Sequence, residues 1–233
     1  MPRHSLIRHA LAPLLVAAGL AHAAPPTVYP EIDPATATYR LAVVELEAQG
    51  ALPQFAECSS PDVLCMDPPP TWFRARVLDT LHGPSLPPRI HGATTSHYGL
   101  MQMASPQYGK ARLMLLMSDG DRHVMPRYAN GFLAEDRSGF LHLVLVDARP
   151  VWWLPCGAMD LKEPIHDAAL ARASRTPLED YQRFFASEHG AAYVVRGRHA
   201  YPRHSIPMAK LAAWLARQRD LPANLQCRPL AAH

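Results

Sequence analysis

A histidine and two methionines near the middle of the chain have side chains of the types that bind copper in proteins. His97 is followed by Met101 and Met103. If this segment is a strand, the two methionines share a face, because side chains two residues apart point to the same side. Thioether sulfur is a soft ligand that selects Cu(I), and the His97 ring would add a nitrogen. The segment therefore predicts a Cu(I) site, and the alternative is that both methionines fill gaps in a core.

A second cluster of chemically active residues is basic and lies in the C-terminal third. Its members are Arg196, Arg198, His199, Arg203 and His204, with Tyr201 among them. Guanidinium groups are planar forks of N–H donors that match phosphate, sulfate and carboxylate. We interpret the cluster as a basic patch between the last two predicted helices, which would hold a phosphate, a sulfated glycan or an acidic partner. The alternative is a solvated loop whose charges pair with nearby carboxylates.

The cysteines predict cross-links rather than catalysis. The chain has four, Cys58, Cys65, Cys156 and Cys227. In an exported chain an even number indicates two disulfides, for which three connectivities exist. We favour a local Cys58–Cys65 bridge and a long-range Cys156–Cys227 bridge. A zinc site is the alternative, although the Cys58–Cys65 spacing is longer than the short pair of a zinc site.

No catalytic motif stands out. The sequence contains neither Gly-x-Ser-x-Gly nor His-Glu-x-x-His, the signatures of many serine hydrolases and zinc peptidases. A carboxylate pair would have to come from the acidic residues Asp119, Asp121, Glu135, Asp136 and Asp147. We interpret these as solvated turn residues, so that the sequence favours a non-catalytic protein.

The N-terminus predicts export. Residues 1–23 contain Arg3 and Arg8, then an apolar run, then Ala21-His22-Ala23 as a cleavage site for a signal peptide. The apolar run is shorter than the roughly 20 residues of a membrane-spanning helix. We therefore expect a periplasmic or secreted protein without a transmembrane segment. The leader would remove two arginines from a total of 23 Lys and Arg against 20 Asp and Glu. This near-neutral balance disfavours nucleic-acid binding.

The elements that must position these residues fall into two parts. Residues 24–38 predict an extended lead-in, and residues 39–156 predict a β-barrel domain. In residues 72–81, Phe73, Ala75, Val77 and Leu81 alternate with polar or exposed positions, which is typical of a strand. Further strands are expected at 39–47, 89–95, 110–117, 140–146 and 151–153, with a turn at residues 118–121.

The pattern changes to helical spacing after Cys156. Thr176-Pro177-Leu178-Glu179 forms a capping box that predicts a helix ending at Gly190. Shorter apolar stripes predict helices over residues 164–174 and 205–219. The predicted fold class is therefore mainly β, an OB-like or netrin-like barrel followed by two or three helices. Residues 157–233 would form a helical C-terminal extension packed on the barrel.

The barrel expectation also comes from a resemblance. The run from Phe73 to Pro84, followed by Arg89 to Thr95, resembles the first hairpin of netrin-like domains, the OB-type barrels that include tissue inhibitors of metalloproteinases. This resemblance implies a secreted, disulfide-bearing barrel with a helical C-terminal element that binds or inhibits other proteins. Those families carry an N-terminal Cys-x-Cys that is absent here, so their inhibitory residues have no counterpart in this chain. The copper-binding segment is similar to the site of periplasmic OB-barrel metallochaperones, without their stacking tryptophan.

Together these patterns predict an exported, non-catalytic binding module whose partner is a protein or an envelope component. A periplasmic Cu(I)-binding protein that uses His97, Met101 and Met103 is the first alternative. A hydrolase that acts on envelope polymers is the second.

Overall fold

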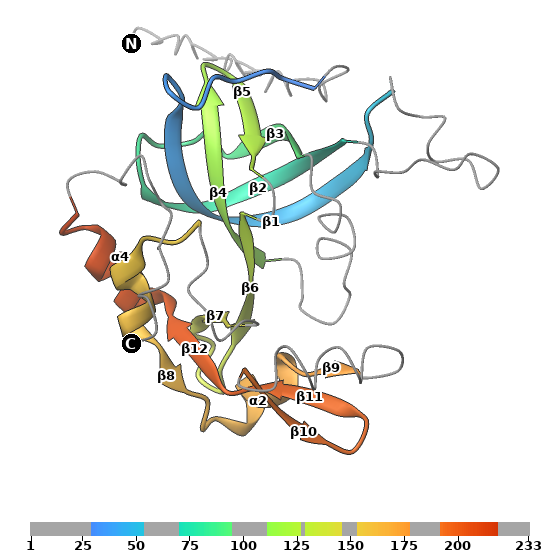
Figure 1. The fold of residues 1–233 in the computed structure, drawn as a ribbon, viewed down its shortest axis with the longest axis vertical. Coiled ribbons are helices and arrows are strands. Elements are labelled where there is room, and N and C mark those ends of the chain that lie inside the picture. Colours follow the sequence, from blue (N-terminus) through green and yellow to red (C-terminus); the bar gives the residue numbers. More distant parts are fainter. Residues whose placement is uncertain are drawn as a thin grey trace, which may run out of the picture.

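The protein is mainly β, with a barrel at one end and a smaller sheet at the other (Figure 1). The computed structural model describes residues 29–53, 70–94, 111–126, 129–145, 153–177 and 192–218. Helices follow the barrel strands in the chain, and one of them lies near the C-terminal end of the described residues. The predicted class, mainly β with a barrel followed by helices, is thus confirmed. No helix in these ranges is long and apolar enough to cross a membrane.

Five of the described strands close into a barrel. They are β1 (Thr38–Ala51), β2 (Thr71–His82), β3 (Arg89–Thr94), β4 (Ala111–Asp119) and β5 (Arg122–Met125). The strands are neighbours in the order β1-β2-β3-β5-β4, and β4 pairs back onto β1. The β3–β5 pair is parallel and the other pairs are antiparallel. The closed barrel is consistent with an OB-like fold.

Strand β1 is long because it takes part in two pairings around the barrel. Residues Thr38–Glu45 pair with β4, while residues Leu41–Ala51 pair with β2. The register with β2 shifts three times, between Leu41 and Ala42, between Val43 and Val44, and between Leu46 and Ala48. Such irregularities bend and twist a strand, which lets one strand follow the curve of a barrel.

The alternation predicted for β2 is confirmed. Phe73 and Ala75 are completely buried, and Val77 and Leu81 are half-buried against the same core. Strand β4 differs because every residue from Arg112 to Leu116 is buried. It is covered on both faces, as expected for a more continuous apolar run. The guanidinium of Arg112 lies 4.6 Å from the centre of the Phe132 ring, a cation–π contact that accommodates the charge.

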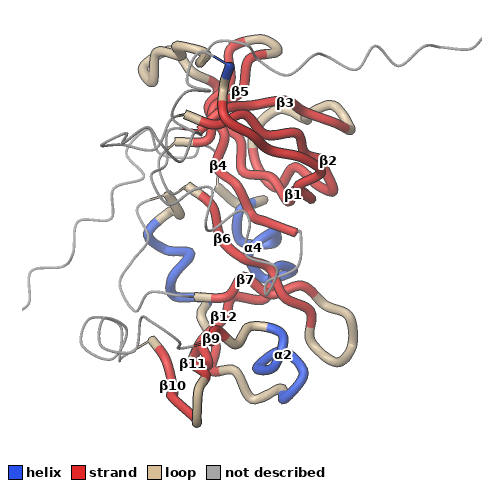
Figure 2. The backbone as a smooth tube through the Cα atoms, turned by 90° about the vertical axis from the view of Figure 1, so that its right-hand side faces the viewer, coloured by secondary structure: helices blue, strands red, loops and turns tan. Residues whose placement is uncertain are grey.

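The sheet continues beyond the barrel through β4. The added strands are β6 (Asn130–Glu135), β7 (Leu141–Val144), β12 (His204–Pro207) and β8 (Glu163–Pro164). Strand β6 pairs with β4, and the order outward is β6-β7-β12-β8. A second sheet has the order β10-β11-β9 and consists, in the described residues, of β9 (Thr176–Pro177), β10 (Tyr193–Arg196) and β11 (His199–Pro202). Figure 2 shows this sheet at the end of the molecule opposite the barrel.

Short helices pack around this extension: η3 (Cys156–Leu161), α2 (Ala168–Ala173) and α4 (Met208–Leu215). Helix α2 is capped at its N-terminus by Asp167, whose Oδ1 accepts hydrogen bonds from the amides of Ala169 (2.8 Å) and Leu170 (2.7 Å). These backbone donors, Leu170 first, lower the pKa of Asp167. Helix α4 buries Met208, Leu211 and Leu215 in the core that the barrel also forms.

Three local predictions after Cys156 are wrong in whole or in part. The helix predicted over residues 205–219 is confirmed over Met208–Leu215, but its start is wrong because Ser205 belongs to β12. Thr176 and Pro177 form β9 instead of the first turn of a helix, and the rest of that predicted helix lies outside the described residues. The basic cluster is not a loop, because β10 and β11 pair as a hairpin. For β12 and β9, a backbone pairing with a distant strand replaces the local structure that the sequence pattern favoured.

Candidate functional site

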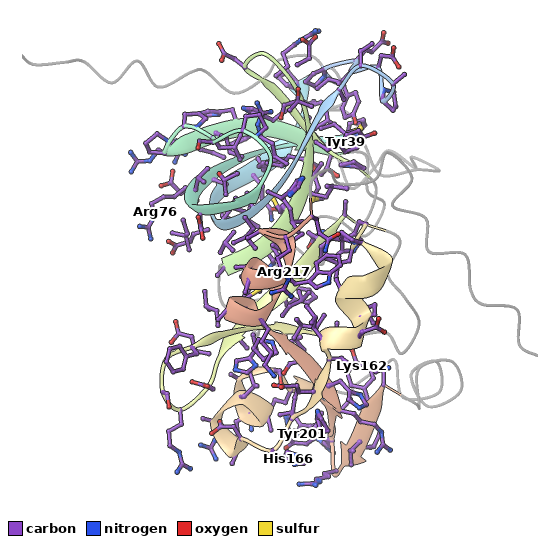
Figure 3. All side chains as sticks on the ribbon, turned by 90° about the vertical axis from the view of Figure 1, so that its left-hand side faces the viewer. Tyr39, Arg76, Lys162, His166, Tyr201 and Arg217 are labelled. Carbon is purple, nitrogen blue, oxygen red and sulfur yellow. The ribbon has the colours of Figure 1, made fainter. Side chains whose placement is uncertain are left out.

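A pocket of about 670 Å³ lies in the extension, away from the barrel. One wall is helix α2 with the segment before it, and the other is the β10–β11 hairpin with the start of β12. In Figure 3, Tyr201 and His166 lie close together at the lower end of the molecule, far from Tyr39 and Arg76 on the barrel. The polar lining consists of His166, Arg172, Arg196, Tyr201, Arg203 and His204.

The hairpin places two of these side chains together. Val194 pairs with Tyr201, and Arg196 pairs with His199, so these four residues share one face of the hairpin. The Arg196 guanidinium lies 5.9 Å from the centre of the Tyr201 ring. Gly197 makes the tight turn with a φ of 58°, a conformation that glycine adopts without steric cost.

The junction of β11 and β12 fixes the next two residues. The Arg203 Nε donates a 3.0 Å hydrogen bond to the carbonyl of Tyr193. The Arg203 carbonyl accepts a 2.9 Å bond from the Ile165 amide. His204 pairs with Pro164 of β8. These bonds join the hairpin to the segment that leads into α2, and they bring the two walls of the pocket together.

The charge of the pocket is uncompensated within the described residues. No aspartate or glutamate is among the lining residues that the structure describes. Arg172, Arg196 and Arg203 form no ion pair with any described carboxylate. Arg172 lies in the last turn of α2, where the helix dipole favours a cation, whereas the other two arginines are on the hairpin side. The site therefore gathers positive charge around a hollow.

The arginines on β2 and β3 of the barrel differ from those of the pocket because they form ion pairs with glutamates. Glu47 of β1 binds both Arg74 (3.1 Å) and Arg89 (3.0 Å), and Glu45 binds Arg76. The hydrogen bond from Arg89 is the main reason that the pKa of Glu47 is lowered. On β2 and β3 the positive charges are thus matched by acids on β1, which is the pattern of a solvated surface.

Comparisons with known protein families, with curated proteins and with solved structures found no match. The site is therefore interpreted from its own geometry.

The predicted basic cluster is only partly brought together. Arg196, Arg203 and His204 line the pocket. Arg198 is exposed at the hairpin turn, and His199 contacts the Tyr201 ring, with 6.3 Å between centroids. The sequence prediction missed His166 and Arg172. Arg172 follows Ala168 and Ala171 at helical spacing, and this spacing is the signal that places it on one face with them.

The other predicted sites lie mostly outside the described residues. This holds for His97, Met101 and Met103, for Cys58, Cys65 and Cys227, and for the side chain of Cys156. The copper site and the two disulfides remain predictions. In the ranges that the structure describes, no group of three or more His, Cys, Asp or Glu side chains is arranged to hold a metal ion.

A serine, a histidine and an aspartate do meet in the extension, but as a structural link. The Ser205 hydroxyl lies 3.2 Å from Nδ1 of His142, whose Nε2 lies 3.4 Å from Oδ2 of Asp136. The Phe140 and Ser138 amides donate to the other oxygen of Asp136 and lower its pKa. Ser205 is only 2% exposed, in a strand with neighbours on both sides. A nucleophile must reach its substrate, so we interpret this link as a tie between the β6–β7 turn and β12.

Proposed function

We propose that this protein is an exported, non-catalytic binding module that holds an anionic group of its partner in the pocket between α2 and the β10–β11 hairpin. The single observation that carries the proposal is the set of three arginines around the pocket, Arg172, Arg196 and Arg203, without an ion pair to a described carboxylate. Gathering like charges around one hollow is unfavourable unless an opposite charge accompanies them. A bound anion supplies that charge.

The location and the class of the module come from the sequence. The leader at residues 1–23 and the four cysteines support a periplasmic or secreted location. The resemblance to netrin-like domains supports a role in binding a protein or an envelope component. In this proposal the binding site is on the extension, because the pocket with the three arginines lies there.

The export proposal has a direct test on the purified protein. We expect its mass to correspond to a chain that starts at Ala24. When the protein is denatured without reductant, no cysteine should react with a thiol reagent. Reduction should then release four thiols, one from each cysteine. A mass that includes residues 1–23, together with four free thiols before reduction, would contradict export.

The binding proposal is tested by titrating the mature protein with inorganic phosphate and following backbone amides by NMR. We expect the shifts to concentrate on α2, the β10–β11 hairpin and His204. Each of Arg172→Gln, Arg196→Gln and Arg203→Gln should weaken binding by about 10-fold or more, since a hydrogen bond to a charged group contributes roughly 1.5–3 kcal/mol.

Arg76→Gln is the matched control. Arg76 is an exposed arginine too, but it is already paired with Glu45 on the barrel. We expect this variant to leave the phosphate affinity unchanged when ionic strength is held constant. Equal weakening by Arg76→Gln and Arg196→Gln, or shifts centred on the barrel, would show only a general charge effect and would refute the pocket.

A further inference from the structure

The pocket is larger than its charged groups require. Its volume of about 670 Å³ lies within the range of sites for small organic molecules, about 300–1,000 Å³. A bare phosphate or sulfate has only five heavy atoms and would leave most of this space to water. The remaining space indicates that the ligand has a second part.

The lining of the remaining space is apolar. It consists of Pro164, Ile165, Ala168, Ala171, Val194 and Pro202. Ala168 and Ala171 lie on the face of α2 that also carries Arg172, because residues three and four apart share one side of a helix. Two methyl groups on this wall leave the space that longer side chains would fill. The ring of Tyr201 adds an aromatic surface from the opposite wall.

The arginines favour one kind of acidic group. They come from separate elements, with Arg172 on α2, Arg196 on β10 and Arg203 at the β11–β12 junction. A carboxylate has two oxygens and fills a single guanidinium fork, whereas a phosphate monoester presents three terminal oxygens to several forks. The arrangement thus suits a phosphate monoester better than a carboxylate.

We propose that the ligand of this pocket is a small organic phosphate monoester, whose phosphate lies among the three arginines and whose ring or short alkyl body lies on the Ala168/Ala171 wall. This inference rests on the proposed function, because it requires the pocket to bind an anion. It adds the acidic group and the apolar body that the ligand must have.

The test compares four probes on the mature full chain by isothermal titration calorimetry: inorganic phosphate, phenyl phosphate, benzoate and phenol. We expect phenyl phosphate to bind at least about 10-fold more tightly than inorganic phosphate, because burying the phenyl group adds to the charge interaction. Benzoate should bind at least about 10-fold more weakly than phenyl phosphate, because it engages fewer donors. Phenol should show no measurable binding.

Variants on α2 test where the apolar part of the ligand binds. In Ala171→Phe the larger side chain would fill the space beside the Ala168/Ala171 wall. The variant should therefore bind phenyl phosphate only as tightly as inorganic phosphate, and its affinity for inorganic phosphate should not change. Ala168→Phe, at an exposed lining position, should do the same and serves if Ala171→Phe fails to fold. Ala173→Phe is the matched control, because Ala173 is exposed on the same helix and does not line the pocket. It should change neither affinity.

The outcomes separate this inference from the proposed function. Equal, arginine-dependent affinities for phosphate and phenyl phosphate would refute the apolar body and leave the anion site standing. Equal affinities for benzoate and phenyl phosphate would refute the phosphate assignment. Tight binding of phenyl phosphate that neither Ala171→Phe nor Ala168→Phe weakens would refute the Ala168/Ala171 wall. Absence of binding by every anion would refute the proposed function itself.

Discussion

Replacing Phe73 with alanine is expected to lower the free energy of unfolding by about 3–5 kcal/mol, the usual cost of truncating a buried phenylalanine. Phe73 is completely buried in the barrel core. Its ring fills the space beside Gly92, where a Cβ atom would lie only 2.4 Å from the ring. Neighbours held in a closed barrel have little freedom to collapse into the cavity that alanine would leave. Unfolding in urea, with the slope of the transition checked for constancy, measures the loss.

Phe140→Ala is the matched control, because this phenylalanine is 67% exposed in the β6–β7 turn. We expect its effect to stay within about 0.5 kcal/mol. If Phe73→Ala does not fold, Phe73→Leu retains most of the volume and should cost less than the alanine variant while remaining measurable. Similar losses at positions 73 and 140 would contradict the barrel core described above.

Acid is expected to destabilise the protein through His123, by about 3 kcal/mol in total between pH 6.5 and 4. Burial on β5 and, second, the charge of Arg40 lower the pKa of His123 to about 4, against the opposing effect of Asp121. The imidazole stays neutral in the folded state and lies 2.8 Å from the Ser118 hydroxyl. Below pH 6.5 the unfolded chain binds a proton that the folded chain does not, so the free energy of unfolding falls as the pH falls.

The measurement is the free energy of unfolding in urea from pH 4.5 to 8 for the wild type and for His123→Gln. Glutamine does not titrate and its amide can still bond to Ser118. We expect the difference between the two proteins to change by up to about 1.4 kcal/mol per pH unit below pH 6.5 and to stay constant from pH 7 to 8. Parallel curves over the whole range would show that His123 does not cause the pH dependence.

The barrel was predictable where its pattern is local. The alternation from Phe73 to Val77 repeats every two residues, and the structure buries Phe73 and Ala75 and half-buries Val77 on the expected face of β2. The extent of β1 was not predictable, because its length depends on pairing with both β2 and β4. No local pattern contains that information, since a closed barrel is defined by contacts between distant segments.

The hairpin that carries the pocket was missed for a different reason. The segment from Tyr193 to Pro202 contains Val194, Val195 and Tyr201, which favour strands, and Gly197, which favours a tight turn. Its charges were interpreted as a basic patch between two helices, with a solvated loop as the alternative, and no strand was expected there. Alternation on each side of a glycine is the signal that identifies the hairpin.

The candidate site was predictable only on the hairpin side. Arg196, Arg203 and His204 are close in sequence and line the pocket, but Arg198, which is equally close, is exposed in the turn and is not among the lining residues. His166 and Arg172 join them through the β8–β12 pairing and the hydrogen bond from the Ile165 amide to the Arg203 carbonyl. Proximity in sequence therefore did not predict which basic residues line the pocket.

Strand β12 comes from the C-terminal part of the chain and lies between β7 and β8 in the large sheet. A fragment ending at residue 156 would keep β7 and lose its outer neighbour. The amide and carbonyl groups that now pair with Ser205 and Ile206 would then face water as an open edge. Such an edge recruits strands from other molecules, so a truncated product would be prone to aggregate even with its barrel sequence intact. The C-terminal segment thus also protects the solubility of the residues that precede it.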